Sequence, residues 1–312
     1  MSVYLIFWDG VGYGRKNSDV NPFFAARLPA LSTLCGSGLF SLRNRRIETP
    51  LASVAPVNAT LGVPGLPQSG TGQTALFAGV NAPKLIGMHF GPYPYSTLCP
   101  IIDSSNLFRR LQDAGARVRF ANGFPQRYLD HLAAHPSKMP VVARAFSSVN
   151  GGLHTHADVR SGYALSADII GSRWKELGHT DIEEIASESA GERFYALGRP
   201  CDFILFEYFL TDKAGHARDH ADACMVLERM DRFIDGLMKR FDFGSDTLLM
   251  ISDHGNIEDL SVKTHTRNPV PLIAAGRGRE FFASSVKRLH DLTPAVAAFV
   301  SERLKERRRL HA

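Results

Sequence analysis

The sequence predicts an α/β protein, with a mostly parallel central sheet that is flanked by helices. Continuous apolar runs recur along the chain, as is typical of parallel strands that are covered on both faces. A long segment with apolar residues at helical spacing lies between two of these runs. The length of 312 residues and the hydrophobic content of 44% are sufficient for one large domain, or for one domain with an insertion.

The elements of this core follow from the apolar pattern. Four apolar runs are predicted as buried strands: Val3–Trp8, Cys201–Leu210, Thr247–Ser252 and Val270–Ala275. Asp219–Phe241 is predicted as the amphipathic helix of a βαβ crossover, because its apolar residues recur at helical spacing. Asn106–Phe124 reads as a further helix followed by a strand.

A less regular stretch interrupts this pattern in the middle of the chain. From about Pro125 to Gly198 the apolar periodicity weakens and polar residues become more frequent. We therefore expect residues 126–195 to form a small inserted cap, and residues 1–125 and 196–312 to form the α/β core. The basic segment Lys305–Leu310 is expected to be the solvated face of a helix.

Composition and charge argue against several classes of protein. The net charge of +5 is mildly basic, which favours anionic substrates only weakly, and no nucleic-acid partner is expected. The four cysteines form no CxxC motif and are expected to be free thiols. The first residues lack the pattern of a signal peptide, and no apolar run has the length of a membrane span. A soluble cytoplasmic protein without a membrane partner is the expectation.

Acidic and histidine side chains follow the predicted strands. Because such positions meet at one edge of an α/β sheet, we expect these side chains to converge there. Three aspartates and three histidines suit a pair of divalent ions. The six candidate ligands are Asp9, Asp212, His216, Asp253, His254 and His265.

The candidate ligands differ in how strongly the local sequence indicates a metal site. Asp212 and His216 would share one face if they lie on a helix, although a capping Asp with a surface His would show the same spacing. Asp253 and His254 can both reach one ion where the chain turns, and Gly255 permits that turn. His265 would complete a group of three ligands with Asp212 and His216.

Two other classes of protein are disfavoured. Gly10, Gly12 and Gly14 follow the first strand, but their GxGxG spacing differs from the GxGxxG of dinucleotide-binding proteins. Neither such a protein nor a non-catalytic binding module would need six candidate ligands.

The segment Pro67–Leu76 offers candidate nucleophiles. Two of its hydroxyl residues are candidates: Ser69 precedes a predicted helix over Thr71–Ala78, and Thr71 begins it. Ser and Thr are ordinary N-cap residues, which would explain their presence. The same position would place a hydroxyl where a helix N-terminus attracts a phosphate.

At this point the sequence resembles the alkaline phosphatase superfamily, in particular its cofactor-independent phosphoglycerate mutases and phosphopentomutases. The motifs DGVG, DKAGH, SDHGN and HTRNPVP occur in the order found in that branch. The resemblance covers roughly residues 1–82 and 201–276. It implies one ion on Asp212, His216 and His265 and a second on Asp9, Asp253 and His254, with Mn²⁺ typical of the branch and Zn²⁺ equally compatible with such ligands.

The resemblance also bears on the nucleophile. Ser69, Gly72 and Gly79 match the register of the mutase motif, whereas Gln73 stands where a mutase has His. Ser69 is therefore the preferred nucleophile, and Thr71 is the alternative.

Phosphoglycerate mutases are much longer and carry a large second domain, so the chemistry transfers better than the physiological reaction does. The sequence predicts a two-metal phosphohydrolase or phosphotransferase that acts on a small phosphate ester through a phosphoenzyme, with a phosphomutase as the alternative. Arg160, in the cap, is the predicted phosphate-side contact.

Overall fold

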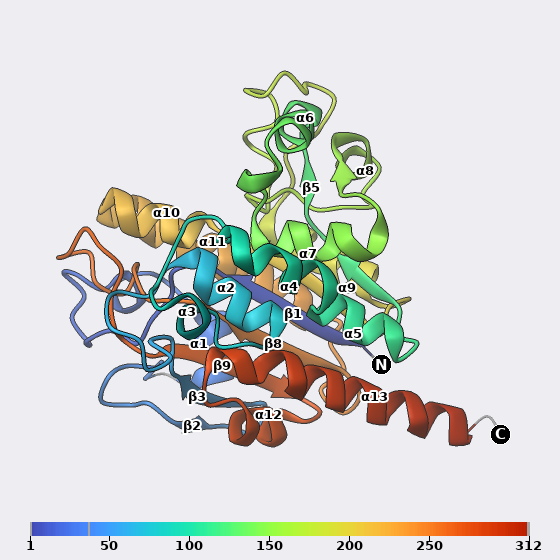
Figure 1. The fold of residues 1–312 in the computed structure, drawn as a ribbon. Helices are drawn as coiled ribbons and strands as arrows, with labels where there is room; N and C mark the ends of the chain where they lie inside the picture. Colours follow the sequence, from blue (N-terminus) through green and yellow to red (C-terminus); the bar gives the residue numbers. More distant parts are fainter. Residues whose placement is uncertain (1, 37, 311–312) are drawn as a thin grey trace.

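The computed structural model describes residues 2–36 and 38–310. Its centre is a sheet of seven strands in the order β2-β3-β9-β8-β1-β7-β4 (Figure 1). The strands of this sheet are β1 (Val3–Trp8), β2 (Ile47–Glu48), β3 (Ala52–Val57), β4 (Val118–Phe120), β7 (Phe203–Tyr208), β8 (Thr247–Ile251) and β9 (Val270–Gly276). The four strands predicted from the sequence are all present, and the α/β class is confirmed.

The direction of β9 corrects one expectation. β8, β1, β7 and β4 are mutually parallel, but β9 pairs with β8 in the antiparallel sense. β3 also pairs with β9 in the antiparallel sense. The apolar run of β9 is buried along its whole length, so its pattern did not distinguish the two directions. Because β9 returns from the edge at which β8 ends, the connection between them stays at that edge.

Helices cover both faces of the sheet. One face packs on a core to which α1 (Pro29–Cys35), α9 (Ser187–Gly198) and α11 (His220–Met238) contribute. The helices of the other face are α2 (Ser69–Ala78), α3 (Ala82–Ile86), α4 (Cys99–Ser104), α5 (Leu107–Asp113), α7 (Val141–Asn150), α12 (Arg279–Ser285) and α13 (Leu292–Leu310). The predicted crossover helix is α11, with Asp219 as its N-cap.

The middle of the chain contains a smaller substructure, which stands at the top of Figure 1. It comprises α6 (Gln126–Ala134), α8 (His156–Arg160) and a two-stranded sheet of β5 (Gly123–Phe124) and β6 (His154–Thr155). Val159, Ala164, Trp174 and Ile182 form a separate small hydrophobic cluster there. By contrast, α7 and α9 pack into the two main cores. The division into core and cap at residues 126 and 195 stays a prediction.

Short segments complete the described chain. α10 (Leu210–Ala217) follows β7 directly, so the predicted strand Cys201–Leu210 is shorter than expected at both ends. Short 3-10 helices lie at Pro22–Phe24, Ser96–Leu98, Pro136–Lys138 and Leu289–Asp291. None of the helices in residues 2–36 and 38–310 is long and apolar enough to cross a membrane.

Candidate metal centre

The candidate ligands meet at the edge where the parallel strands end. Asp9 follows β1, and Asp253 and His254 follow β8. Asp212 and His216 lie one turn apart on α10, so they share a face of that helix. His265 lies in the connection between β8 and β9, which the antiparallel direction of β9 keeps at this edge. The structure therefore brings all six predicted residues to one edge of the sheet.

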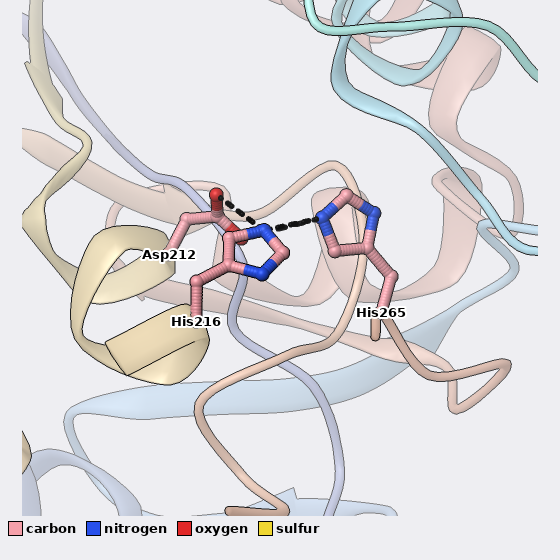
Figure 2. Close-up of side chains that lie close together, drawn as sticks. All are labelled: Asp212, His216 and His265. Carbon is pink, nitrogen blue, oxygen red and sulfur yellow. Dashed lines mark hydrogen bonds and ion pairs between the residues drawn. The ribbon is translucent and has the colours of Figure 1, made fainter. Parts of the chain in front are cut away.

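Asp212, His216 and His265 form the first group that could hold a cation (Figure 2). The Nε2 atoms of the two imidazoles lie 3.0 Å apart. An oxygen of Asp212 lies 3.4 Å from Nε2 of His216, and its other oxygen lies 3.6 Å from Nε2 of His265. Three ligand atoms of the type that Zn²⁺ and Mn²⁺ accept thus face one point.

Backbone carbonyls orient both histidines of this group. Nδ1 of His265 lies 2.8 Å from the carbonyl oxygen of Pro67, and Nδ1 of His216 lies 3.3 Å from that of Lys263. A carbonyl can only accept, so each Nδ1 carries a proton, and the neutral form of each ring would have its lone pair on Nε2, where an ion could bind. This outer-shell contact is the usual one for a metal-binding histidine.

A second group combines Asp9, Asp212 and His254. Nε2 of His254 lies 3.3 Å from Asp9 and 3.5 Å from Asp253, and its Nδ1 lies 4.0 Å from Asp212. Asp212 therefore belongs to both groups. Asp253, which the resemblance assigns to the second ion, lies beside this group and is fully buried.

Unsatisfied polar atoms test whether this site suits a cation. Within the described residues, one oxygen of Asp9, both oxygens of Asp253 and Nδ1 of His254 are buried without a hydrogen-bond partner. A buried carboxylate without a partner costs free energy unless a cation or a donor compensates it. The donor set therefore fits bound divalent ions.

The pKa shifts of the carboxylates also favour a bound cation. Burial, together with the charge of Asp253, raises the pKa of Asp9 well above its ordinary value. Burial also raises the pKa of Asp253 to about 7. Burial acts in the same direction on Asp212, but hydrogen bonds and charges from His216, His254 and neighbouring groups outweigh it and lower its pKa. A cation would relieve the repulsion among these carboxylates.

The histidines of the first group differ from one another. The hydrogen bond with Asp212 raises the pKa of His216, against the effect of burial. Burial, and then the neighbouring His254, lower the pKa of His265 to about 4. His265 is therefore neutral at pH 7, as a metal ligand must be.

Ser69 is the first residue of α2 and not part of the preceding loop, contrary to the sequence expectation. Its Oγ lies 3.0 Å from Nε2 of His254. The hydroxyl of Thr71 instead lies 3.1 Å from the carbonyl oxygen of Gln68 and accepts from the backbone N–H of Phe90 at 3.2 Å. The two candidate hydroxyls thus have different surroundings, and that of Ser69 contacts the ligand cluster.

Two further residues, neither of them among the predicted site residues, donate hydrogen bonds to this cluster. The side-chain amide of Asn256 donates to Asp212 at 2.7 Å, and that of Gln73 donates to Asp9 at 3.3 Å. Gln73 is the residue that departs from the mutase motif, and its amide still reaches the centre. Asn256 stands two residues after His254, so its nearness to a strand end was the available signal.

Arg160 lies elsewhere. It is 54% exposed and forms an ion pair of 2.7 Å with Asp181. Both residues line a cavity of about 270 Å³ in the smaller substructure, which Arg193 also borders. Among the residues that the structure describes, no hydrogen bond or ion pair joins Arg160 to the ligand cluster. Its role as a substrate contact stays a prediction.

Solved structures share this fold. The structure of the PH0037 protein from Pyrococcus horikoshii aligns with a TM-score of 0.56 at 13% identity, and covers 97% of each chain. Alkaline phosphatase from the Antarctic bacterium TAB5 aligns with a TM-score of 0.53 at 12% identity, over 96% of this chain and 97% of that chain. At such identities the likeness concerns the fold only.

Curated relatives share part of the sequence. The 2,3-bisphosphoglycerate-independent phosphoglycerate mutase of Pyrococcus abyssi is 29% identical over 106 residues, which are 30% of this chain and 25% of that protein. A mutase of the same name, numbered 2, from Methanothermobacter thermautotrophicus is 31% identical over 93 residues, or 30% and 22% of the two chains. The match thus spans about a quarter of the length of these relatives.

The fold is of alkaline phosphatase type, and the converging aspartates and histidines form a candidate metal centre. The family model of the Metalloenzyme superfamily matches residues 1–302, and the chain belongs to that superfamily.

Proposed function

We propose that this protein is a two-metal-dependent phosphohydrolase or phosphotransferase that acts on a small phosphate ester through a phosphoserine at Ser69. The observation that carries the proposal is the 3.0 Å contact between Ser69 Oγ and His254, inside the cluster of candidate ligands. The resemblance to alkaline phosphatases in fold and to phosphoglycerate mutases in sequence supports the reaction class.

Two divalent ions, Mn²⁺ or Zn²⁺, would be held by the six predicted ligands. Asp212, His216 and His265 would hold one, and Asp9, Asp253 and His254 would hold the other. Bound ions would lower the pKa of the serine hydroxyl and neutralise charge on the phosphoryl oxygens. The buried acceptors of Asp9 and Asp253 and the free Nε2 lone pairs of His216 and His265 suit this assignment.

The chain itself orients the nucleophile. Ser69 Oγ attacks phosphorus, the ester P–O bond breaks, and the alcohol leaves with a proton. Ser69 stands at the N-terminus of α2, where the helix dipole favours the negative phosphoryl group. Water then attacks the phosphoserine, which releases inorganic phosphate and restores the hydroxyl.

A phosphomutase is the second candidate, because curated relatives of this chain are phosphoglycerate mutases. In that reaction a second hydroxyl of the substrate, instead of water, would take the phosphoryl group from Ser69. The proposal further includes a cytoplasmic location and neither a membrane nor a nucleic-acid partner.

A substrate screen followed by acid quenching tests this function. Phosphate monoesters, diesters and phosphosugars with a labelled phosphate are supplied together with Mn²⁺ or Zn²⁺. The peptide of the quenched enzyme that carries the labelled phosphoryl group is then mapped. We expect label on Ser69, its loss in Ser69→Ala, and its retention in Thr71→Val. Label on Thr71 in an active Ser69→Ala variant would overturn the assignment. Release of inorganic phosphate, against formation of an isomeric ester, separates hydrolase from mutase.

A further inference from the structure

Glu258 lies beneath the ligand cluster and is not one of the predicted ligands. It is 1% exposed, and its carboxylate accepts four hydrogen bonds from three separate segments. One oxygen accepts from the backbone N–H groups of Gly12 at 3.0 Å and Asn256 at 2.7 Å. The other accepts from the Thr266 hydroxyl at 2.5 Å and from the Asn268 amide at 3.1 Å.

Each of these segments carries a candidate ligand close to the donor. Gly12 stands three residues after Asp9, Asn256 stands two after His254, and Thr266 directly follows His265. With about 3.8 Å between consecutive Cα atoms, a shift of any donor would move the neighbouring ligand. Asn256 extends the chain of contacts, because its amide donates to Asp212.

The glycines of two segments fit directly against this carboxylate. A Cβ added at Gly12 or at Gly255 would overlap the carboxyl group of Glu258. The backbone therefore closes on the acid without intervening side chains. Only glycine leaves room for the backbone to approach the carboxylate this closely.

We propose that Glu258 is a positioning residue that holds the three ligand-bearing loops in one register and so sets the shape of the metal centre. This inference rests on the metal sites of the proposed function, but not on its reaction. Glu258 does not itself offer a ligand, because its acceptor positions are already occupied by the four donors.

Glu258→Gln provides the decisive variant. An amide keeps the shape of the side chain, but its NH₂ group cannot accept hydrogen bonds. It would face the two donors that one carboxylate oxygen now accepts from, so those two hydrogen bonds are lost. Glu207→Gln is the matched control, because Glu207 is also a buried carboxyl, and in the described residues no hydrogen bond or ion pair joins its carboxylate to these loops. The probe is Mn²⁺, titrated into metal-free protein by calorimetry.

We expect Glu258→Gln to bind Mn²⁺ roughly 10-fold to 100-fold more weakly, as is typical when an outer-shell partner is removed. Its far-ultraviolet circular dichroism should stay unchanged, and Glu207→Gln should bind Mn²⁺ like the wild type. The concentration of Mn²⁺ needed for half-maximal turnover should rise by a similar factor, with kcat partly restored at saturating Mn²⁺.

Thr266→Val and Asn268→Ala each remove one donor and keep the inference testable if Glu258→Gln does not fold. Each should weaken Mn²⁺ binding severalfold. Affinities within twofold of the wild type in the folded variants would overturn the inference. A wild-type protein that binds Mn²⁺ but turns over no phosphate ester would refute the proposed function only. A wild type that binds neither Mn²⁺ nor Zn²⁺ would overturn both.

Discussion

Buried acids at the two edges of the central sheet, where its parallel strands begin and where they end, have opposite surroundings. At the edge where β7 begins, Asp202 is only 7% exposed, and its two oxygens accept from Arg117 and Arg307 at 2.7–3.3 Å. At the edge where β8 ends, Asp253 is fully buried, and neither of its oxygens has a hydrogen-bond partner in residues 2–36 and 38–310.

The pKa values of these two acids diverge accordingly. Burial would raise the pKa of Asp202, but hydrogen bonds from Arg117 and the charge of Arg307 outweigh it and lower that pKa. For Asp253, burial prevails and raises the pKa to about 7. The first edge is satisfied by the chain itself and contributes to stability. In the proposed function, cations from solution complete the second edge, and shifted pKa values of this kind are typical of functional sites.

Loss of a ligand should give the largest effect. We expect Asp253→Ala and His265→Ala to lose more activity than the roughly 10-fold to 100-fold typical of outer-shell changes, and to bind Mn²⁺ or Zn²⁺ weakly. Metal-free Asp253→Ala should remain folded, because it removes a buried group without partners. Initial rates, metal titration and thermal unfolding measure these outcomes. Near-normal turnover in either variant would contradict the assignment of that residue as a ligand.

A third buried acid, which is not one of the candidate ligands, sharpens the comparison. Glu207 lies in β7 near the metal edge, and burial raises its pKa from 4.5 to about 7. A raised pKa in the folded state favours folding at low pH, and this contribution is lost as the pH rises from 4.5 towards 7. Its size is about 3 kcal/mol, at roughly 1.4 kcal/mol per pH unit.

Glu207→Gln should remove this dependence. Urea unfolding of the metal-free proteins between pH 4.5 and 8 gives the difference in unfolding free energy between wild type and variant. We expect the variant to gain stability relative to the wild type as the pH rises, and the difference to level off above pH 7. A difference that stays flat across this range would show that Glu207 does not titrate there.

Asp202→Asn should be destabilising by about 1–3 kcal/mol at pH 7, the usual cost of leaving buried donors imperfectly paired. The lowered pKa of Asp202 means that its contribution is present above its unfolded value and is lost as the pH falls through the folded one. The deficit should therefore shrink in acid. Activity should match that of the wild type, and a large fall in kcat would break the distinction between the two edges.

The smallest effect is expected from Arg160, which lies away from both edges. As a phosphate-side contact, Arg160→Ala should raise KM without changing kcat or the unfolding free energy. Asp181→Ala is the matched control, because it breaks the same ion pair but leaves the arginine in place. Equal kinetics in both variants and in the wild type would remove Arg160 from the substrate site.

Local pattern was sufficient for much of this molecule. The apolar runs of β1, β7 and β8 and the helical spacing of α11 are properties of short segments, so they could be predicted directly. The order of the motifs indicated the superfamily. The positions of Asp9, Asp253 and His254 at strand ends were also visible, because each directly follows its apolar run.

Only the tertiary structure decided how these segments meet. An apolar run does not encode its direction, so the antiparallel β9, which keeps His265 at the metal edge, could not be predicted. The contact of Ser69 with His254 joins residues 185 positions apart, and that of Glu258 with Gly12 joins residues 246 apart. The sequence by itself determined the elements and the ligand types. Their convergence depends on packing between distant segments, which no local pattern records.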